Sequence, residues 1–283
     1  MKLKDWLDQN KQEFLESDLR FAVKSIFSRD LSLLTLDSPV LSQHQLAFLN
    51  KIKEMYKRKM PLSYILGEEE FFGYKFFVNQ NVLVPRPSSE VIVEKAIEII
   101  ETNKFNRILD LGCGSGNIAI SIAKTLKKRG SYLQDNNEEL MIFASDISFK
   151  ALKVCKVNIE THQVKVKLIN TDLFKGFKHH IFDVIVTNPP YVEEEYIENS
   201  SSLKYEPKVA LAGGRDGLCL IRRILTQAYF YLKREGFILI EIGDNQKDRI
   251  EETVASLKVY DVKEWVKDYS GKWRGIILKL NLT

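Results

Sequence analysis

Four residues with acceptor and aromatic groups follow directly on the apolar run 182–187, which predicts a buried strand. They are Asn188, Pro189, Pro190 and Tyr191. The Asn188 side chain offers a neutral carbonyl, and the prolines offer backbone carbonyls without an N–H of their own. Two fixed acceptors suit a planar nitrogen that carries two hydrogens, and Tyr191 offers a flat face for such a group. The alternative is a plain Pro-Pro turn after a strand.

A glycine-rich turn between a predicted strand and a predicted helix is the second group with ligand-binding character. It reads Asp110, Leu111, Gly112, Cys113, Gly114, Ser115 and Gly116. Glycines allow positive φ and let a ligand approach the backbone closely. The spacing is Gly-x-Gly-x-Gly after an acid, whereas the nicotinamide-binding fingerprint, the first alternative, is Gly-x-Gly-x-x-Gly. A diphosphate gains little from Asp110 beside it, but the ammonium of a methionine moiety gains an ion pair.

Two further acids follow the next two predicted strands. We expect Asp146 to accept hydrogen bonds from ribose hydroxyls and Asp172 to accept one from an adenine amino group. Ile147 and Leu173 are expected to pack on the ring faces. Each acid alone is an ordinary strand-end carboxylate. Three of them on successive strand ends, with the glycine turn and the 188–191 segment, indicate S-adenosylmethionine, which we expect Asn188 to contact as well.

The first part of the chain is predicted to be helical. Residues 1–67 carry three apolar stripes at helical spacing and predict a small helical bundle. Ser17 or Asp18 and Ser42 are candidate N-caps, and Pro39 separates two helices. Nothing in this bundle has catalytic character.

The pattern changes after the bundle to one typical of a β-hairpin. Strands are predicted at 71–78 and 82–84, with the turn between them. The stiff segment Pro85 to Pro87 follows, and Ser88 or Ser89 is expected to cap the next helix. The expected division is therefore a bundle at 1–67, a hairpin linker at 68–87 and a larger domain at 88–283.

Strand and helix patterns alternate in the rest of the chain. Strands are predicted at 107–111, 141–145, 164–170, 182–187, 236–241, 260–267 and 274–281, and helices at 117–129, 148–161, 217–233 and 245–257. This alternation predicts an α/β fold with a Rossmann-like, mostly parallel sheet of seven strands and helices on both faces. The polar stretch 131–139 predicts an exposed loop.

Composition excludes several function classes. The net charge of +4 is spread along the chain, which argues against a dedicated nucleic-acid surface. Cys113, Cys155 and Cys219 and the four histidines, His179 and His180 among them, lack ligand spacing, so we expect no metal. No apolar leader begins the sequence, and no stretch approaches transmembrane length. We expect a soluble cytoplasmic protein without a membrane partner.

Five landmarks together resemble the family of release-factor glutamine methyltransferases over essentially the whole chain. They are 63–67 with 70–73; 82–87; 110–116; 188–191; and 205–207 with 210–211 and 213–218. The glycine turn is common to many methyltransferases, and Asn-Pro-Pro-Tyr also occurs in adenine and cytosine amino-methyltransferases. The other three landmarks indicate this family. One departure is Ser88-Ser89-Glu90, where the family usually has Glu-Thr-Glu, and this puts any cofactor contact of those residues in doubt.

The resemblance implies methylation of the glutamine side-chain amide in the Gly-Gly-Gln tripeptide of class I peptide chain release factors. It implies the fold of class I methyltransferases dependent on S-adenosylmethionine, with a bundle that binds the release factor. We expect a monomer with no direct nucleic-acid partner. Glu206 is expected in the substrate site, where it would support the 188–191 segment. We expect Asn188 Oδ1 and the Pro189 carbonyl to accept the two amide hydrogens and so to align the nitrogen.

Two other functions and one structural question stay open. The closest alternative is an amino-methyltransferase acting on adenine or cytosine in nucleic acid, because a flipped base presents the same NH₂ group. A second alternative is a non-catalytic scaffold that binds the cofactor. The loop 192–206 is either a solvated connection or a flap over the substrate.

Overall fold

The computed structural model of this chain describes residues 1–28, 31–130 and 139–281. The predicted loop at 131–139 lies outside these residues except for Glu139. The chain divides into two compact units: Met1–Glu68 with Ser201–Tyr205, and Glu69–Ser200 with Glu206–Thr283. In the described part of the chain, no helix is long and apolar enough to cross a membrane.

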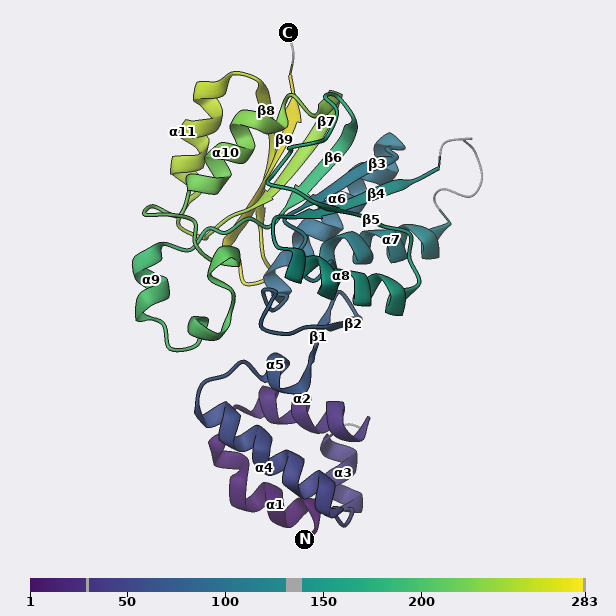
Figure 1. Ribbon diagram of the computed structural model, residues 1–283, viewed down its shortest axis with the longest axis vertical. Helices are drawn as coiled ribbons and strands as arrows, with labels where there is room; N and C mark the ends of the chain where they lie inside the picture. The colour runs from purple at the N-terminus through teal and green to yellow at the C-terminus, as the bar shows by residue number, and fades with distance from the viewer. Residues whose placement is uncertain (29–30, 131–138, 282–283) are drawn as a thin grey trace. The chain divides into compact units, whose positions relative to one another are not determined.

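The first unit is a bundle of short amphipathic helices (Figure 1). They are α1 (Leu3–Asn10), α2 (Glu16–Phe27), α3 (Leu31–Asp37), α4 (Gln43–Lys57) and α5 (Leu62–Leu66). Ser42 caps α4 as predicted, because its Oγ accepts from Gln45 N at 3.2 Å. The predicted cap of α2 is wrong: α2 begins at Glu16, so Ser17 and Asp18 lie in its first turn. Asp18 accepts a hydrogen bond from the Tyr56 hydroxyl instead.

The hairpin exists, but its register differs from the prediction. Its strands are β1 (Glu68–Phe71) and β2 (Tyr74–Phe77), and residues 82–84 form no strand. The turn is Phe72-Gly73, with φ of 52° and 71°. Two left-handed residues close a two-residue hairpin whose twist matches that of the strands. The aromatic residue at φ of 52° gave no local signal of this turn.

The second unit is built on a seven-stranded sheet in the order β5-β4-β3-β6-β7-β9-β8. The strands are β3 (Arg107–Leu111), β4 (Met141–Asp146), β5 (Lys167–Asn170), β6 (Phe182–Thr187), β7 (Leu232–Glu241), β8 (Tyr260–Lys267) and β9 (Trp273–Leu280). The first five pair in parallel, and β9 runs antiparallel to both β7 and β8. The predicted mostly parallel seven-stranded sheet is therefore confirmed.

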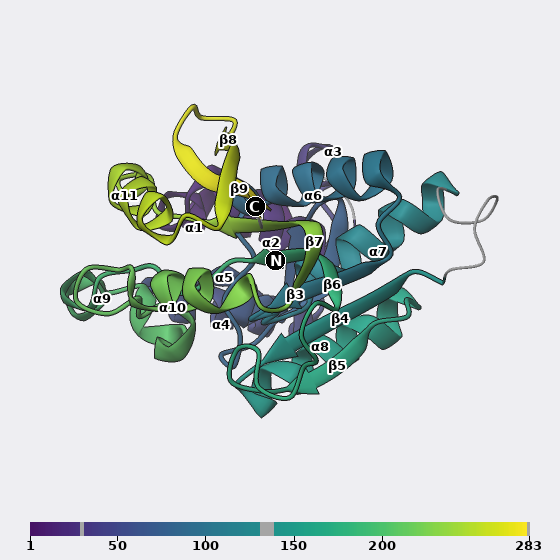
Figure 2. The ribbon, with the colours of Figure 1, turned by 90° about the horizontal axis from the view of Figure 1, so that it is seen from above.

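Helices cover both faces of this sheet (Figure 2). They are α6 (Glu90–Asn103), α7 (Asn117–Arg129), α8 (Phe149–His162), α10 (Cys219–Ala228) and α11 (Lys247–Leu257). Successive strand residues point to opposite faces. Ile108 accordingly packs in the core under α6, α7 and α8, and Leu109 packs in the core under α10 and α11.

Among the elements of the second unit, the largest differences from the predicted boundaries are in β5, α10 and β7. Strand β5 begins only at Lys167, since Val164 N bonds back to the end of α8. Helix α10 ends at Ala228, and β7 begins at Leu232 because that residue pairs with Phe182. The predicted loop 192–206 contains the short helix α9 (Glu194–Asn199) and a 3-10 turn at Leu203–Tyr205.

Candidate active site

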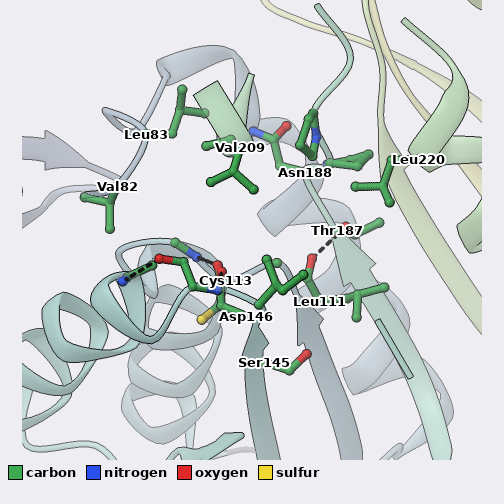
Figure 3. A pocket seen from close by; sticks show the side chains of 18 of the residues that line it. Val82, Leu83, Leu111, Cys113, Ser145, Asp146, Thr187, Asn188, Val209 and Leu220 are labelled. Atoms are coloured by element: carbon green, nitrogen blue, oxygen red, sulfur yellow. Dashed lines mark hydrogen bonds between the residues drawn. The ribbon is translucent and has the colours of Figure 1, made fainter. Parts of the chain in front are cut away.

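A cavity of about 420 Å³ lies at the carboxyl ends of β3, β4 and β6 (Figure 3). The predicted residues that line it are Gly112, Cys113, Gly114, Ser115, Asp146, Ile147, Asp172, Leu173, Asn188, Pro189 and Pro190. Four other predicted residues do not line it: Asp110, Gly116, Tyr191 and Glu206. Figure 3 shows Asn188 and Asp146 on opposite walls. The parallel strands thus bring the predicted strand-end residues together.

The glycine turn after β3 forms one wall of the cavity. Gly112, Gly114 and Gly116 all have positive φ, at 76°, 53° and 80°. A Cβ on Gly112 or Gly114 would meet nothing within 4 Å, whereas one on Gly116 would clash with Cys155 of α8. The first two glycines therefore keep the turn open toward a ligand, and Gly116 allows α7 to pack closely on α8.

Asp110 is buried beneath this turn. Its Oδ2 accepts from Ala119 N at 3.0 Å, while Oδ1 is buried and has no hydrogen-bond partner among the described residues. Burial raises the pKa of Asp110 to about 7. A buried carboxylate oxygen without a donor is the group that a nearby ammonium would satisfy.

Asp146 closes the turn from the end of β4. Its Oδ2 accepts from Gly114 N at 3.0 Å, and its Oδ1 accepts from Ser148 N at 2.8 Å. Burial raises the pKa of this carboxyl group. Each carboxylate oxygen has a second lone pair, so both can still accept from a diol. Ile147 beside it is 57% exposed and presents an apolar surface for a ring.

Asp172, after β5, is paired with two cations. Lys175 Nζ lies 2.9 Å and an Arg223 guanidinium nitrogen 3.2 Å from its carboxylate oxygens. These contacts, that with Lys175 first, hold the pKa of Asp172 below its usual value. Arg223 also lines the cavity from α10. Arg223 was not predicted as a site residue, since a single arginine on a helix face carries no local signal.

Asn188 extends from the end of β6 and forms the opposite wall. Its Nδ2 donates to Ser89 Oγ at 3.2 Å. Its Oδ1 is buried and has no partner among the described residues. The amide is therefore held by its nitrogen, with its strongest acceptor left for another donor. Ser89 occupies the N-cap position of α6, as expected, but makes no side-chain cap.

Tyr191 points away from the cavity. Its hydroxyl donates to Glu241 Oε1 at 3.2 Å, and its carbonyl accepts from Gln246 Nε2 at 3.0 Å. Its ring packs against the core on the side of α10 and α11, and burial raises its pKa. In the structure Tyr191 therefore anchors the segment, and its ring is not a face of the cavity.

Glu206 is buried and contacts the hinge segment. Its Oε2 accepts from Val84 N at 3.1 Å, and its Oε1 pairs with the Arg86 guanidinium. Pro85 and Arg86 in turn line the cavity. Glu206 thus fixes a wall of the cavity through the hinge segment, whereas the expected support was of the 188–191 segment.

Glu241, at the end of β7, is a functional candidate that was not predicted from the sequence. It is fully buried, and burial raises its pKa to about 7. The nearby Ser89 and Tyr191 hydroxyls oppose this rise, and Tyr191 donates to Oε1 at 3.2 Å, while Oε2 is buried and has no hydrogen-bond partner among the described residues. An acid at the carboxyl end of an apolar strand is the signal that identified the other acids. Glu241 has it too, because it ends an apolar strand at the same edge of the sheet. No group of three or more potential metal ligands occurs within residues 1–28, 31–130 and 139–281.

The sheet, the glycine turn and the strand-end acids define a class I methyltransferase fold. The family model described as "Methyltransferase small domain" matches residues 89–203. A release factor glutamine methyltransferase from Thermodesulfovibrio yellowstonii is 36% identical over 275 residues, covering 95% of this chain and 94% of the relative. One from Clostridium acetobutylicum is 34% identical, covering 88% and 89%. The chain belongs to the family of release factor glutamine methyltransferases.

Solved structures agree with this fold. A crystal structure of a methyltransferase from Pyrococcus furiosus superposes with a TM-score of 0.50 and 21% identity. The match covers 85% of this chain and 100% of that one. At this identity the similarity shows the fold alone.

Proposed function

We propose that this chain transfers a methyl group to the side-chain amide nitrogen of glutamine in the Gly-Gly-Gln motif of class I peptide chain release factors. The relatives named above support the reaction and the substrate. The observation that carries the proposal is Asn188 on a wall of the cavity, whose buried Oδ1 accepts no hydrogen bond from any of the described residues. That atom can accept a hydrogen from a primary amide, and a class I fold supplies the methyl-donor site beside it.

The residues on and beneath the opposite wall fit S-adenosylmethionine. Asp110 Oδ1 can accept from its ammonium, and the Asp146 oxygens retain lone pairs for the ribose hydroxyls. Asp172 and the exposed Ile147 suit the adenine edge and face. When bound, this cofactor supplies an electrophilic methyl group on a sulfonium.

The contribution of the protein is alignment of a poor nucleophile. The lone pair of an amide nitrogen is delocalised into its carbonyl. Asn188 Oδ1 and the Pro189 carbonyl accept the two amide hydrogens, which favours a pyramidal nitrogen with its lone pair directed at the methyl carbon. Both acceptors are neutral, so neither competes for the positive charge of a sulfonium. As the nitrogen–carbon bond forms, the bond between the methyl carbon and the sulfonium sulfur would break, and the nitrogen would release one hydrogen as a proton to water.

The bundle is proposed to bind the release factor. Three large apolar side chains of α3 and the segment after it are exposed: Leu33 at 49%, Leu36 at 83% and Val40 at 71%. An apolar surface of this kind suits a protein partner better than a nucleic acid. We call these three residues the α3 surface.

The test is transfer of labelled methyl from S-adenosylmethionine to a purified class I release factor. The control substrate is the same factor with the glutamine of Gly-Gly-Gln changed to alanine. Label on the first and none on the second is the expected result. Label on neither factor, with label on DNA or RNA, would overturn the proposal in favour of the nucleic-acid reading.

A further inference from the structure

Gln246 does not line the cavity, but its side-chain amide contacts three separate segments of the second unit. It is the residue that precedes α11, and it is only 2% exposed. Its Nε2 donates to the Tyr191 carbonyl at 3.0 Å and to the Gly217 carbonyl at 3.3 Å. Its Oε1 accepts from Gly243 N at 2.9 Å. Both nitrogen hydrogens and the oxygen of this amide are therefore bonded within the protein.

The orientation of the Gln246 amide follows from these partners. A carbonyl oxygen can only accept and a backbone N–H can only donate, so exchange of Oε1 and Nε2 would break all three hydrogen bonds. The backbone of Gln246 is bonded to the same turn, because its N–H donates to the Gly243 carbonyl at 3.1 Å. The side chain is therefore held at its base and at its amide group.

The first segment that Gln246 holds is 188–191. Asn188, Pro189 and Pro190 line the cavity, and Tyr191 follows directly after them. The Tyr191 hydroxyl bonds to a side chain, which fixes the far end of its ring. The bond from Gln246 acts on the Tyr191 carbonyl itself, and so it fixes the backbone one residue beyond the cavity-lining prolines.

The second segment is the turn 213–217, which leads into α10. A Cβ on Gly217 would lie 2.6 Å from Gln246 Nε2 and 2.5 Å from the Tyr191 carbonyl oxygen. The turn and the 188–191 segment can therefore meet at Gln246 only because Gly217 has no side chain. The next residue of the segment, Val192, accepts from Gly213 N at 2.9 Å. The two segments are thus joined at both ends of the turn.

We propose that Gln246 is a positioning residue for methyl transfer. It holds the Tyr191 backbone against the turn 213–217 and so sets the place of Asn188 and Pro189 in the cavity. The inference rests on the function proposed for those two residues. Without the Gln246 amide, the carbonyls of Tyr191 and Gly217 would lose their donor, and the acceptors for the substrate amide would be less well placed.

The experiment compares Gln246→Met and Gln246→Glu with wild type. Methionine keeps the length of the side chain and removes all three hydrogen bonds. Glutamate keeps an acceptor for Gly243 N but offers at most one hydrogen to the two carbonyls. We expect both variants to lower kcat about tenfold, with cofactor Kd and release-factor KM changed less than about twofold. Wild-type kcat in either variant would overturn the inference.

The matched control for stability is Val254→Ala. Val254 is a buried core residue further along α11 and does not line the cavity. Its truncation should lower the urea midpoint by an amount comparable to Gln246→Met, but it should leave kcat within about twofold of wild type. An equal loss of kcat in Val254→Ala would assign the effect to destabilisation of α11 and would overturn the positioning role.

A second measurement does not depend on turnover or on the folding of a variant. In ¹⁵N-glutamine-labelled wild type, both side-chain NH₂ hydrogens of Gln246 should exchange at least about tenfold more slowly than those of the exposed Gln80. Equal exchange for the two residues would overturn the inference. If wild type transfers no methyl to release factors, the proposed function fails, whereas the exchange of Gln246 still decides whether this side chain holds the two carbonyls.

Discussion

The ends of β3 and β6 lie on two opposite walls of the cavity, and they are held in different ways. At the end of β3, Asp110 accepts a hydrogen bond from Ala119 N, and Asp146 accepts one from Gly114 N. These partners are 9 and 32 residues apart in the sequence. At the end of β6, Asn188 is bonded to Ser89, 99 residues away. Tyr191 is bonded to Glu241 and Gln246, 50 and 55 residues away. The wall at the end of β3, here called the β3 wall, is held by residues that are closer in the sequence. The wall at the end of β6 is held by more distant segments.

The largest expected effect tests whether the two walls have separate tasks. Asn188→Ala removes the acceptor for the substrate amide but leaves the β3 turn intact. We expect kcat to fall about 10²- to 10³-fold, as for the loss of one transition-state hydrogen-bonding group. Cofactor Kd, measured by calorimetry, should change less than about threefold. Near-normal kcat would remove Asn188 from the mechanism, and a large loss of cofactor affinity would show that the walls are not separate.

Two glycines allow the same comparison through packing. A Cβ on Gly116 would clash with Cys155, and one on Gly217 would lie 2.5 Å from the Tyr191 carbonyl oxygen. We expect each alanine variant to lose about 1–3 kcal/mol of unfolding free energy beyond the cost of its positive φ. Gly116→Ala should mainly weaken cofactor binding, and Gly217→Ala should mainly lower kcat.

The control for these variants is Gly271→Ala. Gly271 also has positive φ, at 83°, but a Cβ there would meet nothing within 4 Å. It should therefore cost only the strain of the left-handed backbone, about 1–2 kcal/mol. Urea unfolding measures all three. Equal losses for the three variants would mean that the contacts with Cys155 and Tyr191 contribute nothing.

The electrostatics of the β3 wall give a smaller effect. Burial holds the pKa of Asp110 at about 7, and binding of an ammonium favours the ionised carboxylate. Binding therefore releases a proton at acidic pH, and cofactor Kd should rise up to about tenfold for each pH unit below 7. The Asp110→Asn variant should bind the cofactor weakly, and its affinity should be nearly constant between about pH 5.5 and 7. Calorimetry in buffers of different ionisation enthalpy counts the released protons. If cofactor Kd changed with pH in the same way in Asp110→Asn, the titrating group would be another residue, and Asp146 would be the next candidate.

The contrast between the walls also explains what the sequence could predict. The strands, the glycine turn and the strand-end residues follow from periodicity and spacing within short windows, and the structure places most of them at one cavity. The partners Ser89, Glu206 and Glu241 could not be paired with their targets, since those contacts join residues 50 to 122 positions apart. The hairpin register was missed for a local reason, because a phenylalanine in a left-handed turn has no distinctive sequence signal.

Substitution on the α3 surface is expected to have the smallest effect, and it tests whether the bundle influences the two walls. Leu36→Glu places a charge on a side chain that is 83% exposed, so the bundle should fold normally. If the bundle binds the release factor, KM for the factor should rise several-fold, while kcat and cofactor Kd stay unchanged. Val262→Glu changes a side chain of β8 that is 41% exposed, and serves as the matched control. Equal KM for both variants would exclude the α3 surface from substrate binding. A change in kcat or cofactor affinity would mean that the two walls respond to the bundle, and the division of tasks between them would have to include it.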